Sequence, residues 1–427
     1  MRIKDEVGCD VTEIKDAMDL AKGVVNSDDK KVESPVVENN ARRHFLMALG
    51  ASASTLVGCG DESIQAREVK PKSPASETAT PNNNGTTTKG QDGSLSTSTT
   101  LLAVAVKTFQ TVSATNATMK VIGGAMGMMG AANTVTMANG QKVVVWGLVN
   151  AVTNQGFNGG ATITPGPVLE MVEGEPVSVT LSSMMAHTIH WHGLDVPTAV
   201  DGDPDTSGWV GNMPSSRVDP TKGLGSSFAY IFTAPPAGTY YYHCHVDTVV
   251  HMEMGMMGSI VVRPPGGESL VYANGPAFDK EYIWQLHTFD STWHKSGHIV
   301  SGPANVRYRP DFFMINGMDG GNLLTDTTVA VTASAGQAVL IRLVNFGYLT
   351  AEVWLGGHTF SIVASDGRPM RKNVVKKAAE TLIIGAGERY EILLGPTTPG
   401  TFAPEVRYYN ALGTLVLGKA ATSLVVT

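Results

Sequence analysis

The chain has 427 residues, a formal net charge of −7 and a charged fraction of only 16%. This mild negative charge excludes a basic surface of the kind that attracts nucleic acid, and the length is sufficient for two domains with a substantial core. The three cysteines, Cys9, Cys59 and Cys244, do not indicate a disulfide framework, so each one needs a separate explanation.

The first 59 residues have the pattern of an export signal. Arg42 and Arg43 resemble a twin-arginine motif, and a short apolar run, residues 45–57, follows them. The run leads into Leu-Val-Gly-Cys59, which resembles a bacterial lipobox whose cysteine is acylated. A weak membrane anchor or a buried helix is the less favoured alternative, because the run is too short for a stable transmembrane helix. We expect residues 1–59 to direct export and Cys59 to carry the lipid anchor of a periplasmic or cell-envelope lipoprotein.

A polar segment separates this signal from the folded part. Residues 60–100 are rich in Ser, Thr, Asn, Pro and Lys, which predicts a disordered linker. From Leu101 onward, short apolar runs alternate with Gly, Pro and Asn, a pattern typical of strands and turns. The main expected strands are 141–150, 176–183, 228–235, 238–245, 258–265, 281–289, 338–346, 358–367 and 381–395. No long helical pattern competes, and Pro-Pro-Gly-Gly at 264–267 forms a joint, so we expect an all-β fold with two sandwich domains, 101–265 and 266–427.

Metal-binding residue types are concentrated in two segments, HTIHWHG at 187–193 and YYHCHVDTVVHMEMGMMG at 241–258. A blue copper site uses two imidazoles, a thiolate and a weak thioether. Cys244 is followed by His251 and then by Met256, and a loop of that length can turn all three toward one metal ion. His187 is the best candidate for the second imidazole, from a neighbouring strand. A single buried Cys or Met is more often core packing, but four ligands of three types in two segments favour copper.

Four further histidines form two pairs, His190 with His192 and His243 with His245. Residues i and i+2 of a strand point to the same face, so each pair presents two imidazoles side by side. Cys244 then points to the opposite face, toward the first copper. This alternation predicts a second metal position and favours an oxidase over a simple electron carrier.

These segments resemble the motifs of the multicopper oxidase family, which comprises laccase-like proteins built from cupredoxin domains. The resemblance covers approximately residues 141–395, with FFMINGMDG at 312–320 and IIGAGERYEILL at 383–394 as weaker matches. It implies two tandem cupredoxin-like Greek-key β-sandwiches. The type 1 copper ligands implied by the resemblance are His187, Cys244, His251 and Met256. The implied half of a trinuclear, type 2 and type 3, copper cluster consists of His190, His192, His243 and His245.

The two-domain members with the type 1 copper in the first domain are the most similar branch. That resemblance implies a homotrimer, with each cluster between the first domain of one subunit and the second domain of the next. It also implies one-electron oxidation of a small-molecule or metal-ion reductant, such as a phenol or a low-valent metal ion, coupled to reduction of O2.

The second half of the chain departs from the family pattern. Trp354 and Gly356 stand where cluster histidines are expected, and Tyr409 lies where a second His-x-His is expected. A non-enzymatic blue copper protein that transfers electrons or handles copper, and has lost the trinuclear cluster, therefore stays an alternative. Four further histidines, His287, His294, His298 and His358, are possible substitutes. His287 and His294, however, fall in a strand-and-turn region that is usually a surface or an interface.

A copper nitrite-reductase-like enzyme is the lesser alternative. Gly-Gly-His358 resembles a segment that, in those enzymes, places a histidine of the neighbouring subunit over a type 2 copper. Their first motif, however, has Asp where this chain has His190, and they lack an imidazole at the position of His245. Both differences favour the oxidase.

Overall fold

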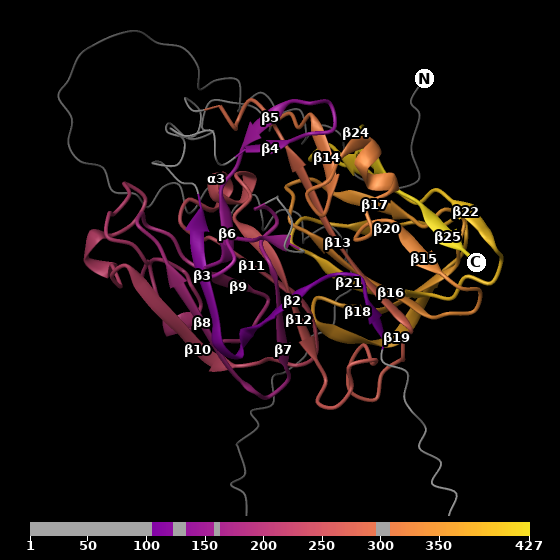
Figure 1. Cartoon of the computed structure of the whole chain (residues 1–427), viewed down its shortest axis with the longest axis horizontal. Helices are drawn as coiled ribbons and strands as arrows, with labels where there is room; N and C mark the ends of the chain where they lie inside the picture. Colours follow the sequence, from indigo (N-terminus) through magenta and orange to yellow (C-terminus); the bar gives the residue numbers. More distant parts are fainter. Residues whose placement is uncertain (1–104, 123–133, 158–162, 296–307) are drawn as a thin grey trace, which may run out of the picture. The chain divides into compact units, whose positions relative to one another are not determined.

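The computed structural model describes residues 105–122, 134–157, 163–295 and 308–427, and the expected signal and linker, residues 1–100, lie outside them. Within these ranges the chain is nearly all β (Figure 1), which confirms the expected fold class. The helical elements there are short: η1 (Ala114–Asn116), η4 (Thr198–Val200), η5 (Pro220–Lys222), α3 (Thr248–Glu253) and η6 (Gly320–Leu324). No helix among the described residues has the length and apolar character needed to cross a membrane.

Two sheets enclose the first apolar core. One sheet has the order β2 (Thr111–Ser113), β7 (Val168–Val172), β12 (Met257–Arg263), β11 (Gly238–His243) and β9 (His190–His192). The other has the order β10 (Ser227–Thr233), β8 (Pro176–Ser182), β3 (Ala117–Ile122) and β6 (Gly147–Asn150). Strand β8 shows why the sheets pack face to face. Val177, Val179 and Leu181 alternate with more exposed residues and enter the core, as a half-buried strand requires.

A second set of sheets encloses a separate core. The largest sheet has the order β1 (Val106–Lys107), β13 (Lys280–Phe289), β16 (Val339–Asn345), β21 (Arg389–Leu394), β18 (Phe360–Ser365) and β19 (Arg368–Lys376), and β14 (Phe312–Ile315) also pairs with β13. The second sheet has the order β20 (Leu382–Ile384), β17 (Ala351–Trp354), β23 (Glu405–Tyr409) and β24 (Val416–Ala421). The smaller sheets are β15 (Val331–Ala333), β25 (Leu424–Val426) and β22 (Gly400–Phe402), and the pair β4 (Thr134–Thr136) and β5 (Lys142–Val144).

The N-terminal strands connect the two sandwiches. Strand β1 runs parallel to β13 of the second sandwich, and β2, three residues further on, runs parallel to β7 of the first. Buried charges reinforce the junction. Arg263 of β12 contacts Glu281 of β13 at 2.6 Å, and Arg342 of β16 reaches the same Glu281 oxygen at 2.6 Å. Buried ion pairs of this kind add little net stability, but they specify which residues come together.

Two expected strands are interrupted in the structure. The run 141–150 divides into β5 and β6, because the backbone N–H of Trp146 donates to the carbonyl of Met254 rather than to a strand neighbour. The run 381–395 divides into β20 and β21 around a turn in which the N–H of Gly385 donates to the Glu388 carboxylate. Both interruptions depend on partners that a periodicity of apolar residues does not reveal.

Candidate metal centres

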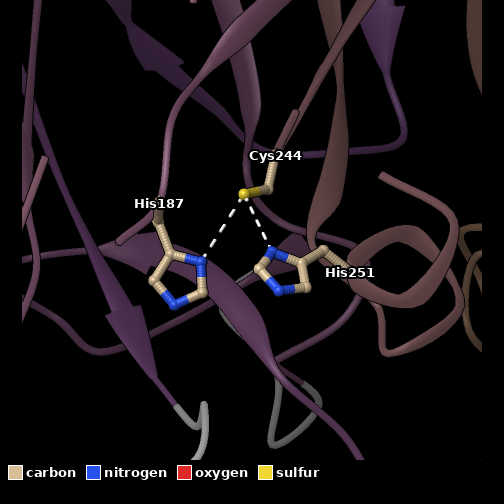
Figure 2. A group of neighbouring side chains, drawn as sticks. All are labelled: His187, Cys244 and His251. Atoms are coloured by element: carbon tan, nitrogen blue, oxygen red, sulfur yellow. Dashed lines mark hydrogen bonds between the residues drawn. The ribbon is translucent and has the colours of Figure 1, made fainter. Parts of the chain in front are cut away.

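The side chains of His187, Cys244 and His251 converge in the first sandwich, and we refer to these three residues as centre 1 (Figure 2). The sulfur of Cys244 lies 3.5 Å from Nδ1 of His187 and 3.1 Å from Nδ1 of His251. All three side chains are buried. Figure 2 shows both Nδ1 atoms turned toward the sulfur, and Nε2 of His187 is buried without a hydrogen-bond partner. Two imidazoles and one thiol around a common point are the donor set that copper prefers.

A short closed loop positions two members of centre 1. Cys244 follows β11, and its N–H donates to the carbonyl of Met256 at 3.1 Å. The N–H of Met256 in turn donates to the carbonyl of His251 at 3.0 Å. Gly255 permits this closure, since its φ is +105° and a Cβ there would clash with the Thr164 side chain. Met256 is fully buried and belongs to the same apolar core as Cys244.

Burial determines the protonation of centre 1. It lowers the pKa of His187 to about 4 and raises the pKa of the Cys244 thiol to about 11. It also holds the pKa of His251 well below its ordinary value, and the neighbouring His187 adds to this effect. Both imidazoles are therefore neutral at pH 7 and available as ligands, whereas the thiol must release a proton when it binds a metal.

A second group, His190, His192 and His243, has its ligand atoms within 4.8 Å of one another, and we call it centre 2. Strand β9 pairs with β11 so that His190 lies opposite His243. The alternate residues Trp191 and Tyr242 point into the core, which places the imidazoles together on the other face of the sheet. The expected alternation is therefore present in the structure.

Hydrogen bonds orient the rings of centre 2. Nδ1 of His190 donates to the carbonyl of Asp201 at 2.7 Å, and Nδ1 of His243 donates to the carbonyl of Cys244 at 3.0 Å. Each of these rings keeps Nε2 available for a metal. Burial lowers the pKa of His243 to about 3, and burial together with the charge of Arg389 lowers the pKa of His192 to about 4. These neutral rings suit metal coordination.

His245 lies beside centre 2 but not in its three-ligand group. Its ring centroid is 4.9 Å from that of His190 and 5.9 Å from that of His243. Its Nδ1 lies 3.9 Å from a carboxylate oxygen of Asp203, and its side chain is 34% exposed. The structure thus brings three of the four expected cluster histidines together as a group and leaves the fourth at the edge.

Comparisons with known proteins identify the family. Two family models, both described as multicopper oxidase, match residues 149–267 and 287–425, which together are more than half of the chain. The chain belongs to the multicopper oxidase family. Membership implies a copper cofactor, in agreement with the donor sets of both centres.

Individual relatives give more detail. Multicopper oxidase MmcO of Mycobacterium tuberculosis is 26% identical over 288 residues, which cover 61% of this chain and 52% of the relative. The chain therefore spans about half the length of the curated relatives it matches. The blue copper oxidase structure from Nitrosomonas europaea is 24% identical with a TM-score of 0.53, covering 72% of this chain and 85% of that one. A copper nitrite reductase structure from the same organism is 20% identical with a TM-score of 0.51, covering 74% of this chain and 94% of that one. The likeness to both structures shows a shared fold and does not discriminate between the two activities.

In this member of the family, the described residues of the second sandwich do not supply imidazoles at the positions where the other half of a cluster is expected. The N–H of the Trp354 indole donates to the carbonyl of Ala378, and the hydroxyl of Tyr409 donates to Glu352. Gly356 has a φ of +63° and offers no side chain. A three-copper cluster thus does not fit the described residues of one chain, whereas one copper ion fits the three imidazoles of centre 2.

The remaining described histidines serve elsewhere. His358 packs against Phe402, with ring centroids 4.3 Å apart. His287 and His294 are both buried. The expectation that they lie at the surface is therefore wrong. His294 contacts the buried carboxylate of Glu253 at 3.3 Å. Because Glu253 belongs to α3 and His294 to the second sandwich, only the tertiary structure reveals this pair.

Proposed function

We propose that the chain is a copper-dependent oxidoreductase that takes single electrons from a small reductant, a phenol or a low-valent metal ion, and delivers them to O2. In this proposal His187, Cys244, His251 and Met256 hold a type 1 copper, which supplies reversible one-electron chemistry when bound. The observation that carries the proposal is the direct covalent connection between the two centres. His243 of centre 2 and Cys244 of centre 1 are consecutive residues whose side chains serve opposite faces.

The protein's own groups support this role for centre 1. The sulfur of Cys244 is fully buried, and both imidazole Nδ1 atoms already face it, so little rearrangement is needed when the metal binds. The Trp146 ring packs roughly perpendicular to the His251 ring, with centroids 5.2 Å apart, and helps to enclose the site. A preformed, water-excluding donor set favours fast electron exchange because few groups move when the charge changes.

For centre 2 we propose His190, His192 and His243 as copper ligands. We propose that the neighbouring His245 joins them as a fourth ligand when the metal binds. Whether the copper there is of type 2 or type 3 depends on how many ions are held. A second candidate function, a blue copper electron carrier, is favoured by the hydrogen-bonded Trp354 and Tyr409 at positions where the family has cluster histidines.

Location and assembly are also proposals. The twin-arginine motif at Arg42 and Arg43 and the lipobox ending in Cys59 support an exported, periplasmic or cell-envelope lipoprotein. The resemblance to two-domain oxidases supports a homotrimer. Intact mass of the mature protein, compared with that of a Cys59→Ser variant, tests the lipid, and light scattering of the purified protein tests the trimer.

Copper content measured together with O2 uptake tests the proposed activity. Copper bound at both centres, with an intense blue absorption and O2 consumption that depends on a phenol or a low-valent metal ion, is the expected result. One copper per chain with the blue absorption but without O2 uptake would instead establish the electron carrier. Two coppers with nitrite turnover would establish the nitrite-reductase-like enzyme.

A further inference from the structure

A buried cation of the second sandwich, Arg389 of β21, lies beside a residue of centre 2. Its guanidinium lies over the ring of Tyr241, 5.9 Å from the centroid. The Tyr241 ring in turn stacks on that of His192, with centroids 4.1 Å apart. The Arg389 side chain is only 5% exposed. Tyr241 therefore contacts both a buried positive charge and one of the imidazoles proposed to bind copper.

Two glycines make this approach possible. A Cβ at Gly193, the residue after His192, would clash with Nη2 of Arg389. Gly387 precedes β21, and its carbonyl accepts a hydrogen bond from Nη1 of Arg389 at 2.8 Å. A Cβ at Gly387 would lie 3.5 Å from Nε2 of His192. The backbone at both ends of this contact is therefore packed closely enough to fix the cation beside the imidazole.

The charge of Arg389 is only partly balanced. Nη1 lies 3.0 Å from Oδ1 of Asp366, but that carboxylate is 47% exposed, so water screens it. Glu391, two residues further along β21, pairs with Arg342 instead. After burial, the charge of Arg389 is the main cause that lowers the pKa of His192. A net positive field from Arg389 therefore reaches centre 2.

A fixed positive charge favours the copper ion of lower charge. When Cu(II) gains one electron and becomes Cu(I), its repulsion by a nearby cation falls by one unit of charge. Buried surroundings strengthen this difference because their effective dielectric constant is lower than that of water. A cation held beside centre 2 therefore stabilises reduced copper there relative to oxidised copper.

We propose that Arg389 is a positioning residue that fixes a positive charge beside centre 2 and so raises the reduction potential of a copper ion held there. This inference rests on the function proposed above, which assigns copper to His190, His192 and His243. Arg389 acts through its field and through its contact with Tyr241, and it is not itself a ligand. A higher potential at centre 2 favours transfer of one electron from centre 1 to centre 2.

Substitutions of opposite electrostatic sign test this role. Arg389→Gln removes the cation, and Arg389→Lys keeps the charge without the planar guanidinium. Asp366→Asn removes the opposing anion, and Asn tolerates the φ of +49° at this position. Arg368→Gln is the matched control, because Arg368 is another cation between the two sandwiches and pairs with Asp195 at 2.9 Å.

The measurement is a redox titration of the copper-loaded chain at equilibrium under argon. Electron paramagnetic resonance follows the Cu(II) of centre 2, and the blue absorption follows that of centre 1. At a fixed solution potential we expect Arg389→Gln to lower the ratio of Cu(I) to Cu(II) at centre 2 by about tenfold and Asp366→Asn to raise it. Arg389→Lys and Arg368→Gln should leave the ratio near its wild-type value.

Lost packing would give a different result from lost charge. Equal shifts in Arg389→Gln and Arg389→Lys, or shifts of the same sign in Arg389→Gln and Asp366→Asn, overturn the inference. If Arg389→Gln does not fold, the half-exposed Asp366 decides alone. A raised ratio in Asp366→Asn then supports the inference, and an unchanged or lowered ratio overturns it.

Copper content and O2 uptake separate this inference from the proposed function. Copper absent from centre 2 of the wild type contradicts the function and, with it, the role of Arg389. Copper at centre 2 with O2 uptake, but without the opposite shifts, supports the function and overturns the role of Arg389. Opposite shifts without O2 uptake support the role of Arg389 and contradict the oxidase.

Discussion

The sulfur of Cys244 lies 3.1 Å from Nδ1 of His251, which is seven positions further along the chain. The segment 244–256 contains α3, and its end returns to its start because the N–H of Cys244 donates to the carbonyl of Met256. One short segment therefore carries three of the four proposed type 1 ligands, Cys244, His251 and Met256.

Replacing the thiol tests the ligand set of centre 1. Cys244→Ser should abolish the intense blue absorption of the copper-loaded protein while leaving the circular dichroism spectrum unchanged, since a serine oxygen is a harder and weaker copper donor. Cys59→Ser is the matched control, because Cys59 is not among the proposed copper ligands, and it should keep the absorption. A blue band that persists in Cys244→Ser would show that the thiolate of centre 1 is not its source.

Gly255 tests how tightly the loop of centre 1 must close. With a φ of +105° and the Thr164 side chain against it, Gly255→Ala should lower the free energy of unfolding by about 3 kcal/mol and shift the blue absorption. Gly174→Ala is the control, because its φ is +81° and a Cβ there meets nothing within 4 Å. The control should cost about 1 kcal/mol and leave the spectrum unchanged. Equal losses in urea unfolding would contradict a steric role of Thr164.

The edge position of His245 leads to a test of centre 2. His192→Ala should remove copper from centre 2 and keep the blue absorption of centre 1, because it deletes one of three converging imidazoles. His245→Ala should retain more copper, since this side chain is partly exposed and outside the group. Metal analysis combined with absorption spectroscopy measures both effects. If His192→Ala and His245→Ala lose the same amount of copper, His245 is a ligand equivalent to His192.

A buried histidine outside both centres predicts acid sensitivity. Burial, with a contribution from His294, lowers the pKa of His287 to about 3. The unfolded chain gains a proton near pH 6.5 that the folded chain does not accept until about pH 3, so the stability present above pH 6.5 is lost as the pH falls through this window. In the copper-free protein, His287→Leu should reduce this dependence by up to about 1.4 kcal/mol per pH unit. Urea unfolding between pH 4 and pH 7 measures the change.

His358→Leu provides the comparison for that experiment. Burial also lowers the pKa of His358, but its side chain is only partly buried. Its replacement should therefore alter the pH dependence less than that of His287. A larger effect at His358 than at His287 would contradict burial as the cause.

Local patterns were sufficient to predict most of the strands and the two groups of side chains that converge, apart from the position of His245. The alternation in HTIHWHG and YYHCH reports which side of a strand each residue faces, and β9 and β11 pair with the histidines on one face and the core residues on the other. The division of the chain into two apolar cores also follows from the apolar runs and the joint at 264–267, although the boundaries themselves stay predictions.

Features made by distant residues could not be predicted in this way. His294 bonds to the carbonyl of Val144, 150 positions earlier, and to Glu253, 41 positions earlier. Tyr308 and Tyr348 of the second sandwich likewise bond through their hydroxyls to α3, at Glu253 and at the carbonyl of Val249. Single-strand periodicity contains no information on such pairings, and the burial of His287 and His294 was missed for the same reason.

Anomalous diffraction at the copper edge, from crystals of the copper-loaded protein, tests the central claim most directly. We expect one peak between the sulfur of Cys244 and the Nδ1 atoms of His187 and His251, and another among His190, His192 and His243. Copper absent from the first position, or bound only at sites away from these residues, would contradict the assignment of this chain as a copper oxidoreductase with two connected centres.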